Sequence, residues 1–222
     1  MKTFKRFLTE APKIYNSDRH YPNEDSEDLI IKGNIEDSPV IDFSDWVEYD
    51  EQYSPGCIVE GNVTVSKIDS FKTCVGAPSK IKKTLTIQYC KNFISLKGLP
   101  EKIGGNLYGL NIRGCTALTT LEYCPKQLGA YFNLDGCTSL ISLKYMPKKM
   151  DGDLFLTDCK NLKNILHVFL TIGIDEIHYD ANQSNLEQAL YIICDHYFKK
   201  DRDLLECKAE LIERGLSEYA KL

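Results

Sequence analysis

The chain has 222 residues, of which 43% are hydrophobic and 27% are charged, and its formal net charge is −5. This composition is typical of a globular protein, and the acidic balance disfavours a general role in nucleic-acid binding. No apolar run approaches the roughly 18 residues of a membrane span, and the N-terminus lacks the apolar core of a secretory signal. Nine cysteines, an odd number, favour a reducing compartment.

Residues 1–10, MKTFKRFLTE, form a short segment with an amphipathic pattern. Phe4, Phe7 and Leu8 recur at i, i+3 and i+4, which places them on one side of a helix, and the three basic residues fall on the other side. So short a helix is marginal alone in water and would order on a partner. A cap helix and a membrane-surface helix are the structural alternatives.

The same segment resembles the capsid-targeting peptide of the internal head proteins of T-even-like tailed phages. In that family the peptide directs the protein into the prohead, and the prohead protease then cuts after Leu/Ile-x-Glu and before a small residue. Leu8, Glu10 and Ala11 match that pattern. The resemblance therefore implies a cut between Glu10 and Ala11, which would lower the net charge by two, to −7.

Residues 11–55 are predicted to form an acidic linker and an N-terminal cap. Between positions 16 and 52 the chain carries twelve acidic residues against two basic ones. The stretch NSDRHYPNEDSED is typical of a linker, whereas LIIKGNI and VIDFSDWVEY predict one or two strands of a cap. An alternative function for the acidic stretch is to imitate the phosphates of nucleic acid and occupy a nuclease.

Residues 56–180 contain a tandem repeat with the pattern apolar-x-apolar-x-x-Cys-x-x-apolar-x-x-apolar. The four clearest units are LTIQYCKNFISL (85–96), LNIRGCTALTTL (110–121), FNLDGCTSLISL (132–143) and LFLTDCKNLKNI (154–165). Their cysteines, Cys90, Cys115, Cys137 and Cys159, are spaced by 25, 22 and 22 residues, and Pro78, Pro100, Pro125 and Pro147 recur with a similar period. The longer spacing places three extra residues between Pro100 and Cys115.

These units resemble the leucine-rich repeat family, in particular the compact repeats of bacterial and phage proteins. The resemblance implies an α/β repeat solenoid with a parallel β-sheet, in which each coil buries its apolar residues against the next. Each cysteine is predicted to be a small buried side chain that donates its S–H to a loop carbonyl. A row spaced by 22 residues does not provide the close ligand pairs of a zinc site, so no metal is expected.

The outward residues of the predicted strands are mostly polar, with two aromatic side chains among them. We expect this surface to bind a protein partner, because solenoid surfaces are commonly used for binding; a solvated polar sheet face is the alternative. The candidate partner-binding residues are Thr86, Gln88, Asn111, Arg113, Tyr131, Asn133, Asp135 and Phe155. Tyr131, Arg113 and an exposed Phe155 are of the types that anchor interfaces.

Residues 181–222 are predicted to form a helical cap. SNLEQALYIICDHYFKK begins with a capping box, Ser184 followed by Glu187. DRDLLECKAELIERGLSEYAKL repeats a helical apolar pattern with Leu204, Leu205, Leu211 and Ile212, and it is expected to end or kink at Gly215. Such a cap would cover the end of the solenoid core.

No catalytic motif is present in the sequence, and no cofactor is expected. This absence favours a non-enzymatic protein, and the resemblance of residues 1–10 implies a phage internal head protein that is located in the virion interior and then in the host cytoplasm. There it would bind a host protein, without direct contact to nucleic acid or membrane. The alternatives are a structural component of the prohead core, the acidic mimic of nucleic acid, and an enzyme with a site near His167, His178 and His196.

Overall fold

The computed structural model describes residues 19–20, 29–31, 57–75, 77–105, 107–180, 184–198 and 203–222. The predicted targeting peptide, with Leu8, Glu10 and Ala11, and nearly all of the predicted acidic linker lie outside the described residues. Within the described chain, no helix has the length and apolar character needed to cross a membrane.

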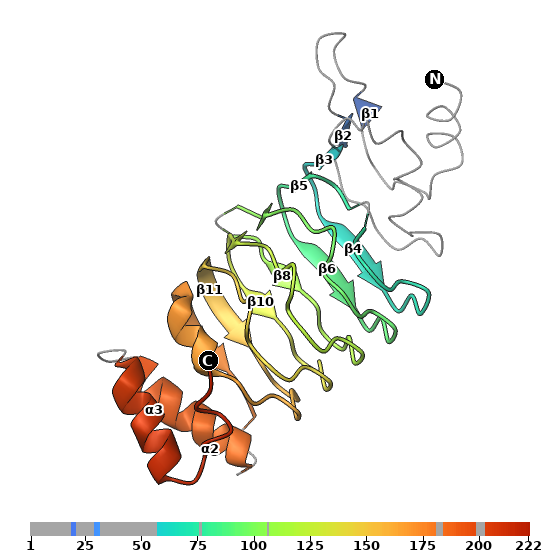
Figure 1. Ribbon diagram of the computed structural model, residues 1–222. Coiled ribbons are helices and arrows are strands. Elements are labelled where there is room, and N and C mark those ends of the chain that lie inside the picture. The colour runs from blue at the N-terminus through green and yellow to red at the C-terminus, as the bar shows by residue number, and fades with distance from the viewer. Residues whose placement is uncertain are drawn as a thin grey trace.

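The repeats stack as coils, and their apolar-x-apolar segments form a parallel ladder along the length of the molecule (Figure 1). The ladder consists of β4 (Val63–Ser66), β6 (Leu85–Gln88), β8 (Leu110–Asn111), β10 (Phe132–Asn133), β11 (Lys149–Phe155) and β12 (Ile172–His178). Burial alternates along β4 and β6, because successive strand side chains point to opposite faces. We call the outward surface of this ladder the strand face.

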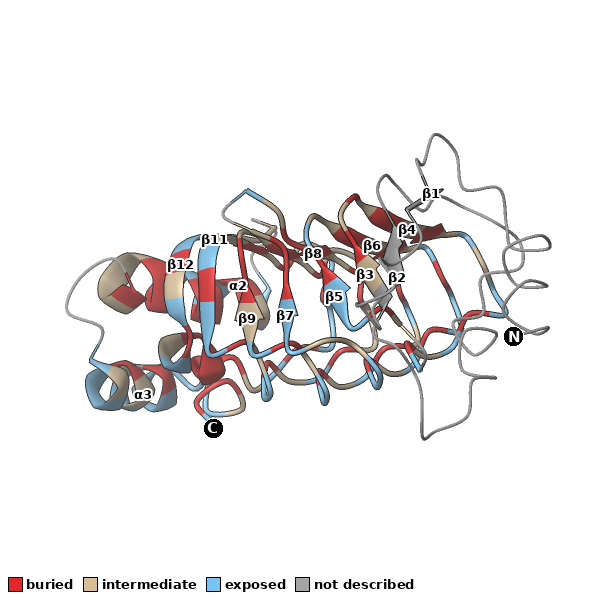
Figure 2. Cartoon of the chain, turned by 90° about the horizontal axis from the view of Figure 1, so that it is seen from above, coloured by how far each residue is buried: buried red, intermediate tan, exposed pale blue. Residues whose placement is uncertain are grey.

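A second parallel ladder runs along another side of the coils, at the segments that follow the prolines (Figure 2). Its strands are β2 (Leu29–Ile31), β3 (Cys57–Val59), β5 (Lys80–Ile81), β7 (Lys102–Ile103), β9 (Gln127–Leu128) and the start of β11, and β1 (Arg19–His20) pairs with β2 in antiparallel orientation. The bridges Thr73–Ser95 and Ser142–Asn164 join neighbouring coils on a third side. Each coil is therefore three-sided.

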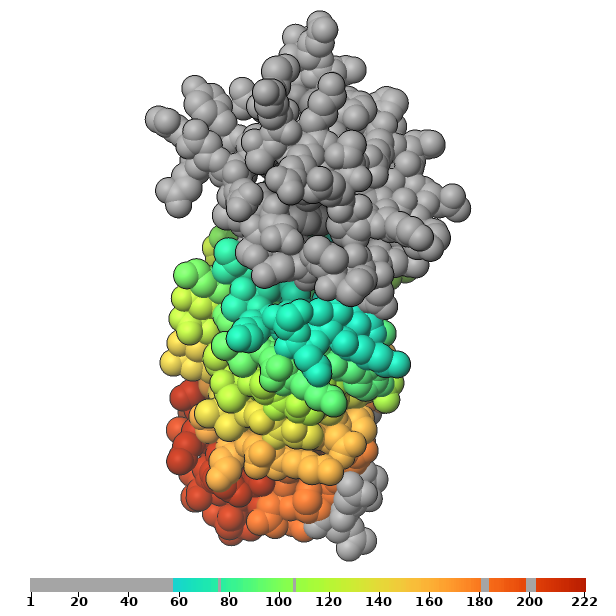
Figure 3. Space-filling view, turned by 90° about the vertical axis from the view of Figure 1, so that its right-hand side faces the viewer, coloured from blue at the N-terminus to red at the C-terminus, as the bar shows by residue number. Residues whose placement is uncertain are grey.

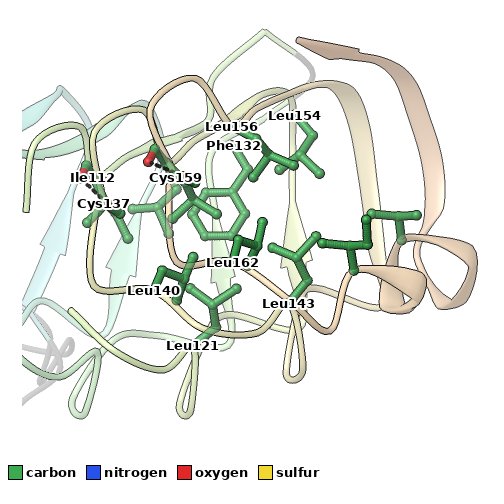
Figure 4. Packing of buried hydrophobic residues seen from close by; sticks show 14 of the residues in the cluster. Ile112, Leu121, Phe132, Cys137, Leu140, Leu143, Leu154, Leu156, Cys159 and Leu162 are labelled. Atoms are coloured by element: carbon green, nitrogen blue, oxygen red, sulfur yellow. Dashed lines mark hydrogen bonds between the residues drawn. The ribbon is translucent and has the colours of Figure 1, made fainter. Parts of the chain in front are cut away.

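The core is a single apolar column enclosed by the three sides of the coils. Figure 4 shows Phe132 at its centre, surrounded by leucines from successive coils, among them Leu121, Leu140 and Leu162. Nearer the N-terminal end, Phe71 and Phe93 stack with their ring centroids 5.5 Å apart. One coil cannot enclose such a column, so the core forms only when several coils stack.

Each repeat cysteine is buried and donates its S–H to a backbone carbonyl of the preceding coil. The distances from Sγ to oxygen are 3.9 Å for Cys90 to Val65, 3.3 Å for Cys115 to Ile87, 3.2 Å for Cys137 to Ile112 and 3.2 Å for Cys159 to Leu134. The contacts of Cys137 and Cys159 are drawn in Figure 4. The predicted role of these cysteines as buried S–H donors is confirmed.

Burial raises the pKa of the Cys115, Cys137 and Cys159 thiols, to about 12 for Cys159, and the thiolate is the reactive form. In the folded protein we therefore expect Cys137 and Cys159 to resist iodoacetamide at about pH 8, and to react once urea unfolds the chain. Peptide mass spectrometry measures the labelling. As a control, Thr119→Cys places a thiol at an exposed position and should react in the folded state. Equal labelling rates for Cys137 and the control thiol in the folded protein would contradict the burial of the repeat cysteines.

The C-terminal residues form a helical cap over the last coil, at the red end of the chain (Figure 3). The cap comprises α2 (Asn185–Tyr191), the π-helix η3 (Ile192–Phe198) and α3 (Leu204–Glu213), and it packs near the 3₁₀-helix η2 (Leu166–Leu170). The predicted capping box of Ser184 and Glu187 is present, and Phe198 meets Phe169 edge to face at 6.2 Å. The predicted repeat solenoid with a parallel sheet and a helical C-terminal cap is thus confirmed.

Helix α3 departs from the sequence prediction in which residues it buries. Leu211 and Cys207 are buried, whereas Leu205 and Ile212, which the helical pattern assigned to the apolar side, are 77% and 51% exposed. Two adjacent residues on a helix point about 100° apart, so the narrow contact with the last coil buries Leu211 and leaves its neighbour Ile212 exposed.

Candidate functional site

The strand face contains one continuous row of residues in register across its strands. The row runs through Thr64, Thr86, Asn111, Asn133, Phe155 and His178, each paired with the next. Its chemistry changes along the molecule, from hydroxyls through amides to two aromatic rings. The predicted partner-binding residues therefore lie on one surface, but they differ in what their side chains contact.

Three of the predicted residues use their side chains to accept hydrogen bonds from backbone N–H groups of the solenoid. Asn111 Oδ1 accepts a hydrogen bond from the Arg113 N–H at 3.1 Å, and Asn133 Oδ1 accepts one from the Asp135 N–H at 2.9 Å. Asp135 Oδ1 accepts in turn from the Thr157 N–H of the next coil at 2.9 Å. These contacts satisfy donors where the chain leaves each strand, so they give Asn111 and Asn133 a structural role.

Thr86 and Gln88 lie on β6, nearer the N-terminal end of the strand face. Gln88 Nε2 donates to Ser66 Oγ of the preceding coil at 3.4 Å, and both Thr86 and Gln88 are half-buried. Arg113 is exposed but lies on a coil that precedes the aromatic residues.

Three rings gather at the C-terminal end of the strand face, and we call Tyr131, Phe155 and His178 the aromatic cluster. Phe155 stacks on His178 with centroids 4.4 Å apart and planes 11° from parallel. Tyr131 meets Phe155 edge to face, at 6.3 Å and 87°. Both geometries are favourable for aromatic pairs. The sequence prediction of an exposed Phe155 is wrong, because the neighbouring rings leave it half-buried.

A carboxylate holds the cluster in place from the side. Asp153, two residues before Phe155 on β11, contacts His178 Nε2 through Oδ2 at 3.0 Å, and both side chains are 37% exposed. The contact fixes the imidazole plane against Phe155. The cluster thus presents rings in a defined arrangement with an acidic group beside them.

Sequence reasoning did not assign His178 and Asp153 to this site. Asp153 is not among the predicted partner-binding residues, and His178 was considered only for an enzymatic site. His178 follows Phe155 by 23 residues, close to the repeat period, but the segment around it has no cysteine. Continuing the row of outward residues beyond the last cysteine would have found it.

The three histidines of the possible enzymatic site have different surroundings. His167 lies buried in η2, where burial lowers its pKa. His196 Nδ1 lies 3.2 Å from Glu210 Oε1. The Glu210 carboxylate also accepts a hydrogen bond from the Tyr197 hydroxyl and forms an ion pair with Arg214. Burial would raise the pKa of Glu210, but the three hydrogen bonds outweigh it and lower the pKa. The contacts of His178 with Asp153 and of His196 with Glu210 thus explain their positions structurally, whereas the buried Nδ1 of His167 has no hydrogen-bond partner among the described residues.

The described residues offer no grouping of three or more His, Cys, Asp or Glu side chains that could hold a metal ion. Burial also raises the pKa of Cys115 and Cys207 to about 12, so these thiols stay protonated at neutral pH.

The second ladder carries a row of lysines on its outward surface. Lys80, Lys102 and Lys149 lie on its strands, and all three are exposed. Acidic neighbours accompany this row, since Lys82 pairs with Glu60 and Lys149 lies 3.6 Å from Asp151. The mixture of charges is typical of a solvated surface.

Comparisons with protein-family models, with curated proteins and with solved structures found no match to this chain. The candidate site is therefore defined by its geometry alone, as a polar parallel-sheet surface that ends in the aromatic cluster and Asp153.

Proposed function

We propose that this protein is a non-catalytic binding protein that recognises another protein through its strand face. The observation that carries the proposal is the aromatic cluster, in which Tyr131, Phe155 and His178 are held in fixed orientations at the surface. Aromatic side chains dominate the energetics of many interfaces. Rings that are already ordered lose little further entropy when a partner binds, so more of the contact energy appears as affinity.

Site-directed photo-cross-linking tests the strand face. Benzoylphenylalanine at position 131 or 155 should form an adduct with one and the same partner in host lysate. At position 141, where Ile141 is 55% exposed on the third side of the coils, the same probe should give no such adduct. Adducts at position 141 that equal those at 131 and 155 would contradict a specific strand-face interaction.

Substitution provides a second, independent measurement. Replacing Tyr131, Phe155 and Arg113 together by alanine should abolish capture of the cross-linked partner, because these residue types anchor interfaces. Ile141→Ala removes an exposed apolar side chain elsewhere and should leave capture unchanged. Full capture by the triple variant would refute the proposal.

We further propose that the protein is an internal head protein of a phage, packaged in the virion and delivered with the genome into the host. The support is the resemblance of residues 1–10 to capsid-targeting peptides, with Leu8, Glu10 and Ala11 at the cleavage pattern. In the host, the partner would be a cytoplasmic protein, for example a defence protein. A net charge of −5 makes DNA condensation an unsuitable role.

Mass spectrometry of purified virions tests packaging in the virion and cleavage of the N-terminus. A peptide that begins at Ala11 supports packaging and cleavage by the prohead protease. A chain that still begins at Met1, or no chain at all, refutes them. A structural prohead-core component would also begin at Ala11, but its strand face would cross-link to no host protein. An acidic mimic of nucleic acid would bind its target through residues 16–52 and would tolerate the triple strand-face substitution.

A further inference from the structure

We propose that the aromatic cluster, with the carboxylates beside it, binds an arginine side chain of the partner protein. This inference rests on the proposed function and specifies the chemistry of the group that the strand face recognises. It follows from the coincidence of ring faces and acidic oxygens at one end of the surface.

The first step is the local charge. Asp153 contacts His178, and Asp135 lies on the neighbouring coil, after β10. Asp180, two residues after His178, accepts a hydrogen bond from the Asp158 N–H at 2.8 Å. Of these four acids, Asp158 is accompanied by a lysine, Lys160, at 3.2 Å. The exposed Arg113 lies on the coil next to Asp135, so four acids face two cations, Arg113 and Lys160. The C-terminal end of the strand face is therefore negative on balance, and it attracts a cation.

The second step is the shape of the cation. Aromatic rings attract cations over their faces, and the planar guanidinium both stacks on rings and donates several hydrogen bonds at once. The compact ammonium group of lysine keeps its hydration more tightly and cannot stack. Aromatic rings with carboxylates beside them therefore fit arginine better than lysine.

The third step is the remaining capacity of the carboxylates. The contact with His178 uses Oδ2 of Asp153, and the hydrogen bond from Thr157 uses Oδ1 of Asp135. An ionised carboxylate can accept about four hydrogen bonds. Both groups can therefore accept from an incoming guanidinium without giving up the contacts that hold the cluster together.

The same arrangement disfavours two other occupants. Phosphate groups of a nucleic acid would be repelled by Asp135, Asp153 and Asp180, although its bases could stack on the rings. An apolar side chain would cover the carboxylates and remove their hydration without supplying donors. Arginine satisfies both the rings and the acids better than either of these occupants.

NMR titration of the isotope-labelled full chain tests the inference. The probe is acetyl-Gly-Arg-Gly-amide, and the comparison peptide carries lysine in place of arginine. We expect saturable shifts centred on Tyr131, Phe155 and His178, with the lysine peptide binding roughly 3- to 10-fold more weakly. Equal affinity for the two peptides, or shifts centred elsewhere, would overturn the inference.

Two charge-matched variants sharpen the result. Asp153→Asn keeps the size of the side chain and should lower the affinity for the arginine peptide at least about threefold, because the charged acceptor is lost. Asp69→Asn removes the same charge at an exposed position in the coil of β4 and should change the affinity little. Equal weakening by both variants would show that overall charge alone attracts the peptide, which would overturn the inference.

The titration and the cross-linking experiment can fail separately. A partner that cross-links at positions 131 and 155, while the arginine peptide causes no shift, leaves the proposed function intact and overturns the arginine inference. Saturable, arginine-selective shifts support the inference, and the absence of a cross-linked partner would then count against the proposed function alone. An octanucleotide that binds the same rings would assign the surface to nucleic acid and overturn both.

Discussion

Replacing Phe132 by alanine is expected to lower the free energy of unfolding by about 3–5 kcal/mol. The Phe132 side chain on β10 is fully buried, between the coils that carry Leu110 and Leu154 in register with it. Those coils are held by the backbone ladder, so they cannot collapse into the space that the ring leaves. Urea denaturation followed by circular dichroism measures the loss.

Phe155→Ala is the matched control for this substitution. Phe155 lies on the adjacent strand but faces outward, where it is half-buried against Tyr131 and His178. Its removal should cost about 1–2 kcal/mol, mainly from the two aromatic contacts, and should instead abolish partner binding. If Phe155→Ala destabilised the protein as much as Phe132→Ala, the assignment of inward and outward faces would be wrong.

The contrast between these two phenylalanines shows what the sequence could predict. Alternation along a strand is a local property, so the inward positions of each repeat, such as Leu110 and Phe132, follow from the pattern alone. The constant position of the cysteine predicted its buried role for the same reason. Both predictions needed only the repeat period and the geometry of a single strand.

The second ladder was harder to predict. Strands such as Lys102–Ile103 and Gln127–Leu128 are two residues long, too short to show an alternating pattern. Their strand character comes from pairing between coils, since Ile103 lies opposite both Ile81 and Leu128. A contact of this kind depends on how the coils stack, which local propensity does not report.

The composition of the candidate site depended on register in a similar way. Asp135 was predicted as a binding residue, but its Oδ1 accepts from Thr157 in the next coil, 22 residues along the chain. His178 joins Phe155 only because the last strand continues the ladder after the cysteine pattern has ended. Alternation along the strands therefore predicted which residues face outward, while register decides which of their side chains make structural contacts.

Gly129→Ala is expected to cost about 3 kcal/mol in the free energy of unfolding, at the upper end of the usual cost of overpacking. A Cβ at position 129 would lie 1.9 Å from the carbonyl oxygen of Gly105 in the preceding coil. Backbone atoms cannot move aside as a flexible side chain can. The two coils would have to separate, which would stretch the hydrogen bond from the Gly129 N–H to the Ile103 carbonyl, now 3.1 Å.

Gly215→Ala separates this clash from the general cost of replacing glycine. Gly215 follows α3 with φ +76°, and a Cβ there would meet no atom within 4 Å. Its substitution should cost only about 1 kcal/mol, from the left-handed backbone conformation. Denaturation of both variants under the same conditions gives the comparison, and equal losses would contradict the proposed contact between coils.

The clash at Gly129 falls beside the longer repeat unit. The three extra residues of that unit lie between Pro100 and Cys115, and Gly105 is within that interval. Gly129 on the next coil passes directly over the Gly105 carbonyl, where a side chain would not fit. A glycine at position 129 therefore lets the next coil pack closely against the longer unit. If shortening the loop around Gly105 restored the stability of Gly129→Ala, this coupling between the two coils would be demonstrated directly.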